Sequence, residues 1–146
     1  MKSLIILLLL PISLFSQKKI TKEEFKELII KGNALVIDVR TPVEFSEAHI
    51  KNAINIDYFS KSFEATISKL DKKKTILVYC AAGGRSTSAC LDFKKLGFKK
   101  VYNLYGGILH WVNQGRPVFA NGKPTLQVHT YSKPWSIWLT KGEKVY

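Results

Sequence analysis

Continuous apolar stretches alternate along this chain with stretches in which apolar residues recur at helical spacing. The longest continuous stretches, ALVIDV at 34–39 and TILVYC at 75–80, predict buried strands. Shorter stretches at 53–56 and 100–104 predict two more strands. Runs that are continuous rather than alternating are typical of a sheet whose two faces are both covered.

Helices are predicted between these strands. TKEE at 21–24 forms a capping box ahead of an apolar face, and the helix that it begins should end at Gly32. The segment around Pro42 is predicted to be a short irregular loop. Apolar residues at helical spacing predict the other helices at 60–70, at 85–96 and from Gly107 onward.

This alternation predicts one α/β domain with a doubly wound, mainly parallel sheet and helices on both faces. A chain of 146 residues is long enough for one such domain and its core. In parallel sheets of this kind, ligands bind beyond the carboxyl ends of the strands. Cys80 stands at that end of the most apolar strand, so the pattern alone makes it a candidate functional residue.

Residues 1–16 have the pattern of a secretory signal peptide. Lys2 precedes an apolar run at 4–15, and small or polar residues follow it up to Gln17. The run is shorter than the roughly 20 residues that a helix needs to span a bilayer, which favours cleavage over a permanent anchor. We therefore expect cleavage near Ser16 or Gln17, a periplasmic or secreted protein, and no stable membrane insertion.

The chain is basic, with 23 Lys and Arg against 11 Asp and Glu and a net charge of +12. Its lysines are scattered among helix ends and turns, which predicts a solvated basic surface and no nucleic-acid partner. Loss of residues 1–16 would remove Lys2 and leave +11. Such a charge concentrates small anions near the protein in a salt-dependent way.

The chain has two cysteines, Cys80 and Cys90. In the predicted helix at 85–96, Cys90 falls on an apolar stripe with Ala89 and Phe93, which indicates a core residue. It would lie about 7 Å along the helix axis from the helix start, too far back to reach Cys80 without backbone movement. We therefore expect no disulfide between them, although export would permit one.

The loop CAAGGRS at 80–86 joins the central strand to the next helix. Its glycines permit the positive φ angles of a backbone nest that points N–H groups inward, so the loop can cradle an anion. Those donors, the helix N-terminus and Arg85 would together stabilise a thiolate at Cys80. The pattern therefore favours a nucleophile over an inert cysteine.

Three motifs in order resemble the rhodanese family over residues 20–118. DVRTPVEF at 38–45 with AHIKNAINI at 48–56 is similar to the first signature, and CAAGGRS is similar to the active-site loop. GFKKVYNLYGGILHW at 97–111 is similar to the closing signature. The resemblance implies a rhodanese-like fold, and it leaves 119–146 as an extension of unknown role.

The resemblance implies a sulfurtransferase. Cys80 would take sulfane sulfur from thiosulfate, a polysulfide or a persulfide, hold it as a persulfide, and pass it to a thiophilic acceptor. No metal or organic cofactor is implied, and a protein acceptor stays undefined. The family loop also implies the substrate-binding residues, which are Ala81, Ala82, Gly83, Gly84, Arg85 and Ser86.

Two alternatives stay open. A cysteine-dependent phosphatase of the dual-specificity type shares this fold, but it places five residues between cysteine and arginine where Cys80 and Arg85 enclose four. A non-catalytic rhodanese-like binding module is the other alternative, and such modules commonly lack the cysteine. Both comparisons favour sulfur transfer.

The remaining residues of the motifs have structural interpretations. Asp38 and Arg40 resemble an ion pair that holds the loop after the strand, His49 lies away from the active-site loop, and Trp111 is expected to pack the last helix. Ala48 and Asn52 replace glycines that are usual in the first signature.

The extension at 119–146 has strand-like composition around Pro134. We expect it to pack on the same domain, but it could instead cover the site or meet a partner.

Overall fold

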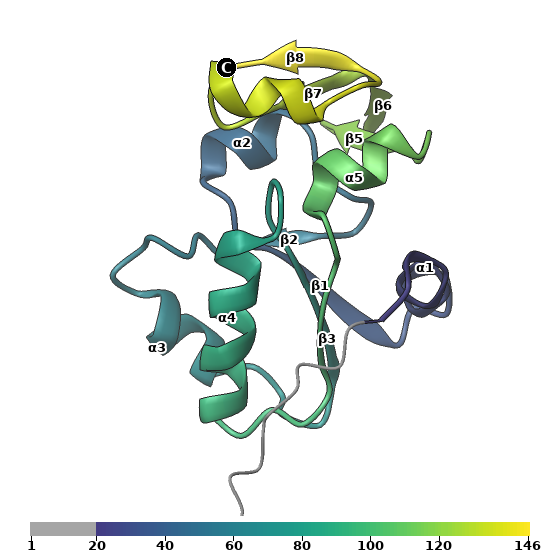
Figure 1. The fold of residues 1–146 in the computed structure, drawn as a ribbon. Coiled ribbons are helices and arrows are strands. Elements are labelled where there is room, and N and C mark those ends of the chain that lie inside the picture. Colours follow the sequence, from purple (N-terminus) through teal and green to yellow (C-terminus); the bar gives the residue numbers. More distant parts are fainter. Residues whose placement is uncertain (1–19) are drawn as a thin grey trace, which may run out of the picture.

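The computed structural model describes residues 20–146, and its framework is a four-stranded parallel sheet (Figure 1). The predicted signal peptide at 1–16 lies outside the described residues. The central pair of strands sets Val36 opposite Leu77 and Asp38 opposite Tyr79. The strands lie in the order β2 (Ile54–Asn55), β1 (Ala34–Asp38), β3 (Thr75–Tyr79) and β4 (Val101–Asn103).

Helices cover both faces of this sheet, as the apolar pattern predicts. On one face, α3 (Phe63–Ser68) and α4 (Gly84–Lys95) pack on alternate residues of β1 and β3. On the other face, α1 (Lys22–Ile30) and α5 (Gly107–Asn113) pack on the intervening residues. Figure 1 shows α4 and α1 on opposite sides of the sheet. The doubly wound α/β prediction is therefore confirmed.

Local capping decides where two of the helices begin. Thr21 and Glu24 form the predicted capping box of α1. The prediction of an irregular loop around Pro42 is wrong, because α2 (Pro42–Glu47) occupies it. Thr41 and Glu44 form a second capping box there, and Pro42 suits the first helical turn because that position needs no N–H donor.

The extension packs on the same domain, as expected. Val128 and Leu139 are buried in the core that also holds α5, and Phe119 exchanges backbone hydrogen bonds with His49. In Figure 1 the extension, coloured yellow-green to yellow, lies above α2 and α5. Its strands pair as β5 (Val118–Ala120) with β6 (Lys123–Thr125) and as β7 (Gln127–His129) with β8 (Glu143–Val145).

One part of the extension differs from its strand-like composition. Residues Lys133–Trp138 form a 3₁₀ helix, η1, with Pro134 in its first turn. Proline suits that position because its φ is already helical and its missing N–H has no partner to lose. Pairing of β7 with β8 on either side of η1 makes the extension a folded unit rather than a trailing strand.

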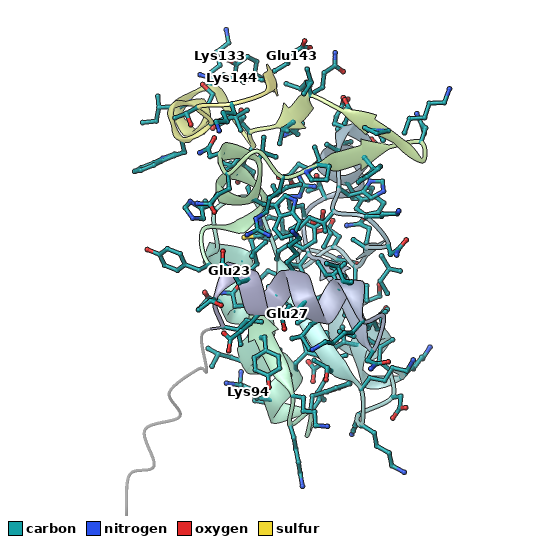
Figure 2. All side chains as sticks on the ribbon, turned by 90° about the vertical axis from the view of Figure 1, so that its right-hand side faces the viewer. Glu23, Glu27, Lys94, Lys133, Glu143 and Lys144 are labelled. Carbon is teal, nitrogen blue, oxygen red and sulfur yellow. The ribbon has the colours of Figure 1, made fainter. Side chains whose placement is uncertain are left out.

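The basic residues labelled in Figure 2 do not gather on one surface. Lys133 and Lys144 project from the extension, and Lys94 lies at the opposite end of the molecule. Within the described part of the chain, no helix is long and apolar enough to cross a bilayer.

Candidate active site

Cys80 lies at the carboxyl end of β3, where the chain turns into α4. The turn passes through Gly83, whose φ of +113° lies in the left-handed region that favours glycine. The cysteine is only 2% exposed and packs with the core on the α4 face of the sheet. Its backbone position thus follows from an apolar strand and a glycine that permits the turn.

Two donors lie against the Cys80 sulfur. The backbone N–H of Gly83 donates to Sγ at 3.0 Å, and the Ser86 hydroxyl lies 3.4 Å from the same atom. Ser86 is fully buried in the first turn of α4, and its hydroxyl also lies 3.2 Å from the Gly83 carbonyl oxygen. These donors and the positive end of the helix favour a negatively charged sulfur at this position.

The start of α5 holds the loop from the other side. The backbone N–H of Ile108 donates to the Cys80 carbonyl at 2.9 Å, and that of Leu109 donates to the Ala81 carbonyl at 3.2 Å. This close approach requires glycine at Gly107, because an added Cβ would overlap both carbonyl oxygens and φ is +60°. The closing motif therefore serves the site through its backbone.

Arg85 is held by Glu44 of α2. Its two terminal nitrogens donate to the two carboxylate oxygens at 2.7 and 2.8 Å, and both side chains are largely buried. Burial opposes the charge of Glu44, but hydrogen bonds from Arg85 and the Thr41 backbone, with the positive charges of Arg85 and Arg40, outweigh it and lower the pKa of Glu44. Burial likewise opposes the charge of Arg85, yet its bond to Glu44 raises the pKa of the guanidinium.

A pocket of about 190 Å³ opens above the cysteine. Its rim carries two aromatic side chains, Phe59 from the loop after β2 and Tyr131 from the extension. The Arg85 guanidinium carbon lies 5.6 Å from the Phe59 ring centroid and 5.0 Å from that of Tyr131. The lining residues are Phe59, Cys80, Ala81, Ala82, Gly84, Arg85 and Tyr131.

The structure brings the sequence-predicted loop residues together. Five of the seven line the pocket, and the other two, Gly83 and Ser86, contact the sulfur. Sequence reasoning missed Glu44, Phe59 and Tyr131. The capping-box pattern at 41–44 was a visible signal for the helix that carries Glu44, whereas nothing in the sequence marks Tyr131 as a neighbour of the loop.

The structural interpretations hold for the other motif residues. Asp38 and Arg40 form a fully buried ion pair at 2.7 Å. His49 stacks on Phe45 at 4.1 Å, and Trp111 donates from its indole nitrogen to the Pro117 carbonyl at 3.0 Å.

The two replaced glycines differ in their backbone requirement. Ala48 is extended, a conformation open to any residue. Asn52 has a φ of +62°, and asparagine tolerates that conformation better than most side chains.

The second cysteine is a core residue, as predicted. Cys90 is 1% exposed, and both cysteines are free thiols. Burial, with a smaller effect of Cys80, raises the pKa of Cys90 to about 12 despite the charge of Lys94. No group of three His, Cys, Asp or Glu side chains within residues 20–146 is placed to hold a metal ion.

Comparison with known proteins places this geometry in context. The family model described as "Rhodanese-like domain" matches residues 21–114. The chain is 36% identical over 94 residues to the thiosulfate sulfurtransferase GlpE of Coxiella burnetii, a match that covers 64% of this chain and 86% of that protein. It is 32% identical over 88 residues to a sulfurtransferase of Allochromatium vinosum, covering 60% of this chain and 80% of that protein.

A plant protein and a solved structure also match this chain. Protein HIGH ARSENIC CONTENT 1, a mitochondrial protein of Arabidopsis thaliana, is 37% identical over 98 residues. That match covers 60% of this chain and 56% of the plant protein, so the chain spans little more than half of that relative. The crystal structure of a rhodanese-related protein from Thermoplasma volcanium superposes with a TM-score of 0.62 at 32% identity, covering 69% of this chain and 96% of the other.

Proposed function

Because this chain belongs to the rhodanese-like domain family, we propose that it is a sulfurtransferase that carries sulfane sulfur on Cys80. The observation that carries the proposal is the placement of this sulfur. It lies at the base of a small pocket and receives the Gly83 N–H at 3.0 Å, with the Ser86 hydroxyl nearby. Relatives named as sulfurtransferases support the same reaction class.

The reaction proceeds in two displacements at sulfur. The Cys80 thiolate attacks the outer sulfur of the donor, the donor's S–S bond breaks, and the leaving group departs with the electron pair. With thiosulfate the leaving group is sulfite, and the enzyme is left as a Cys80 persulfide. A thiophilic acceptor then attacks the terminal sulfur and releases the thiolate. Donors at 83 and 86 stabilise negative charge on sulfur in both states.

The position of Arg85 favours sulfur transfer over a phosphatase reaction. A phosphatase needs the guanidinium to hold the phosphoryl oxygens, but here both terminal nitrogens donate to Glu44. Four residues also separate Cys80 from Arg85, one fewer than in the phosphatases of this fold. The pocket therefore supports binding of a compact sulfur compound.

The loop also bears on the choice of donor. Many rhodaneses have a basic residue just after the nucleophilic cysteine, where this chain has Ala81. Among the pocket-lining residues, Arg85 is the one with a charged side chain. Because that charge is paired with Glu44, thiosulfate with its two negative charges should bind weakly. A low-molecular-weight persulfide, or a polysulfide that carries an organic group, has less charge on its sulfur chain and suits the pocket better.

Two assays test the reaction class. Purified protein should transfer sulfur from thiosulfate, a polysulfide or a persulfide to cyanide, with thiocyanate as the measured product, and it should leave aryl phosphates intact. Mass spectrometry after donor alone should show one added sulfur on the peptide that contains Cys80. Phosphate release without thiocyanate would replace the proposal with the phosphatase alternative, and neither product would favour the binding module.

We also propose that the protein acts outside the cytoplasm after cleavage near Ser16 or Gln17. Support comes from the charged start, the apolar run and the small residues of 1–16. N-terminal sequencing of protein from a fractionated Gram-negative cell should find a start near residue 17 or 18 in the periplasm. Recovery of intact Met1 in the soluble cytoplasmic fraction would contradict this proposal.

A further inference from the structure

Tyr131 reaches the pocket above Cys80 from outside the family-matched region. The family match ends at residue 114, whereas Tyr131 follows β7 in the extension. Its ring nonetheless lines the pocket with Phe59, and its centroid lies 5.0 Å from the Arg85 guanidinium carbon. The extension therefore supplies one wall of the site.

The backbone at Tyr131 is unusual for an aromatic residue. Its φ is +73°, and the other non-glycine residues with positive φ in the described part of the chain are Asn52 and Asn121. Asparagine adopts this conformation readily, while a bulky side chain does so at an energetic cost, and such costs are often found at functional sites. Glycine would adopt this φ without the cost, so the strain directs attention to what the tyrosine ring contacts.

The segment that leads into Tyr131 is anchored in packed structure. Val128 is fully buried in the core, and Thr130 is buried with its N–H donating to the Val145 carbonyl at 2.9 Å. The N–H of Tyr131 itself donates to His129 Nδ1 at 3.0 Å. The ring is thus presented by packed structure rather than by a trailing end.

The pocket favours a ligand with an apolar body and little charge. Its charged lining side chain, Arg85, is neutralised by Glu44, and the other lining side chains are aromatic, alanine or the thiol. A cavity of about 150 Å³ is large enough for one benzene ring. At about 190 Å³, this pocket has room for a ring and a reactive sulfur group above the nearly buried Cys80.

We propose that Tyr131 and Phe59 are specificity-determining residues that select organic sulfane donors carrying a planar apolar group. This inference rests on the proposed function of Cys80. With an aryl thiosulfonate, the Cys80 thiolate forms a bond to the sulfane sulfur, the bond between that sulfur and the sulfonyl sulfur breaks, and the aryl sulfinate leaves with the electron pair. The aryl ring then lies in the pocket, in contact with the Phe59 and Tyr131 side chains that line it.

Two donors of equal charge isolate the effect of the ring. Benzenethiosulfonate and methanethiosulfonate are both monoanions, so the ratio of their kcat/KM values with cyanide reports on the organic group alone. We expect the wild type to favour benzenethiosulfonate about fivefold, through KM. Tyr131→Gly fits the positive φ and should bring this ratio close to one. Tyr131→Phe retains the ring and should retain the preference.

Tyr146→Ala is the matched control. Tyr146 also belongs to the extension and is about half exposed, but it does not line the pocket. Like Tyr131 it lies near a basic side chain, with Lys133 Nζ 5.8 Å from its ring centroid. Its replacement should leave the donor ratio unchanged, and thermal melting of each variant checks that the fold is retained. A wild-type ratio near one, or an unaltered ratio in Tyr131→Gly, would overturn the inference.

A binding measurement separates this inference from the proposed function. In a Cys80→Ser background, titration calorimetry should show that benzenethiosulfonate binds more tightly than methanethiosulfonate. Addition of Tyr131→Gly should abolish this difference in affinity. If wild-type protein forms no persulfide with any donor, the sulfurtransferase proposal fails, but this titration still decides whether the rim selects aryl groups. If Cys80→Ser and Cys80→Ser with Tyr131→Gly bind benzenethiosulfonate with equal affinity, the proposed selection by Tyr131 is refuted.

Discussion

The loop around Cys80 and the helix interior around Cys90 place the same side chain in two different settings. Cys80 is 2% exposed and Cys90 is 1% exposed, and both belong to the same core cluster. Cys80 receives the Gly83 N–H and lies beside the Ser86 hydroxyl below a pocket. Cys90 lies with Ala89 on the buried side of α4, and its pKa rises to about 12.

Burial therefore does not separate Cys80, the nucleophile that we propose, from the core residue Cys90. What differs is whether donors face the sulfur and whether a ligand can approach it. A buried thiol without donors keeps its proton, since the thiolate is poorly solvated in an apolar environment. A buried thiol with donors and a pocket can serve as a nucleophile.

The sharpest test of this contrast replaces each cysteine by serine. Cys80→Ser should lower thiocyanate formation by on the order of 10³-fold or more, because the hydroxyl cannot carry the sulfur. Cys90→Ser should retain most of the activity, since Cys90 does not line the pocket, although a buried hydroxyl lowers stability. Equal losses in both variants would indicate a relay or disulfide between the two thiols.

Alkylation at different pH values tests the inert setting of Cys90. At pH 8, a pKa of about 12 leaves Cys90 some 10³-fold less ionised than an unfolded cysteine, so iodoacetamide should modify it only after denaturation. The unfolded state loses this proton near pH 8.5 and the native state near 12, so the free energy of unfolding should fall as pH rises between them. Peptide mapping should show Cys80 modified first, and rapid native modification of Cys90 would contradict the prediction.

Glu44→Gln tests how Glu44 supports the loop at 80–86 through Arg85. Loss of the carboxylate leaves Arg85 largely buried without its ionic partner, which should lower the free energy of unfolding by about 3 kcal/mol at pH 7. Because the folded-state pKa of Glu44 lies below its ordinary value, its contribution is present above about pH 4.3 and is lost as pH falls through the folded-state value.

Denaturant melts of both proteins measure this effect. The difference between wild type and Glu44→Gln should therefore shrink in acid. Glu47→Gln is the control, because it changes a carboxylate on the same helix that makes none of the ion pairs found in residues 20–146. A constant difference from pH 7 to pH 3 would show that the Glu44 charge is not what stabilises the loop.

Ala81→Arg should have the smallest effect. Ala81 is buried but lines the pocket, so an arginine there must extend into the pocket to be partly exposed. A cation in that position is worth about 0.5 to 1 kcal/mol, so KM for thiosulfate should fall about two- to fivefold with little change in kcat. Added salt should reduce the gain because it screens the new charge. Micromolar saturation of the wild type by thiosulfate, with no change in the variant, would show that the missing cation is unimportant.

The sequence by itself determined the features that depend on local spacing. Apolar periodicity located the strands at 34–39 and 75–80 and the helix at 85–96, because burial of one face or of a whole strand leaves a fixed repeat. It also placed Cys80 at the carboxyl end of the central strand. The pairing of Asp38 with Arg40 was expected from the resemblance of the first motif, and it is local, since the two residues are two positions apart.

Only the tertiary structure decided the features that join distant segments. Glu44 and Arg85 are 41 residues apart and meet because α2 follows β1 and α4 follows β3, two paired parallel strands whose carboxyl ends lie side by side. Tyr131 reaches the pocket because Val128 and Leu139 anchor the extension in the core, and the pairing of β7 with β8 then orients the turn between them. A local pattern records which face of an element is buried, but not which element covers it, so these contacts arise only when the chain is packed.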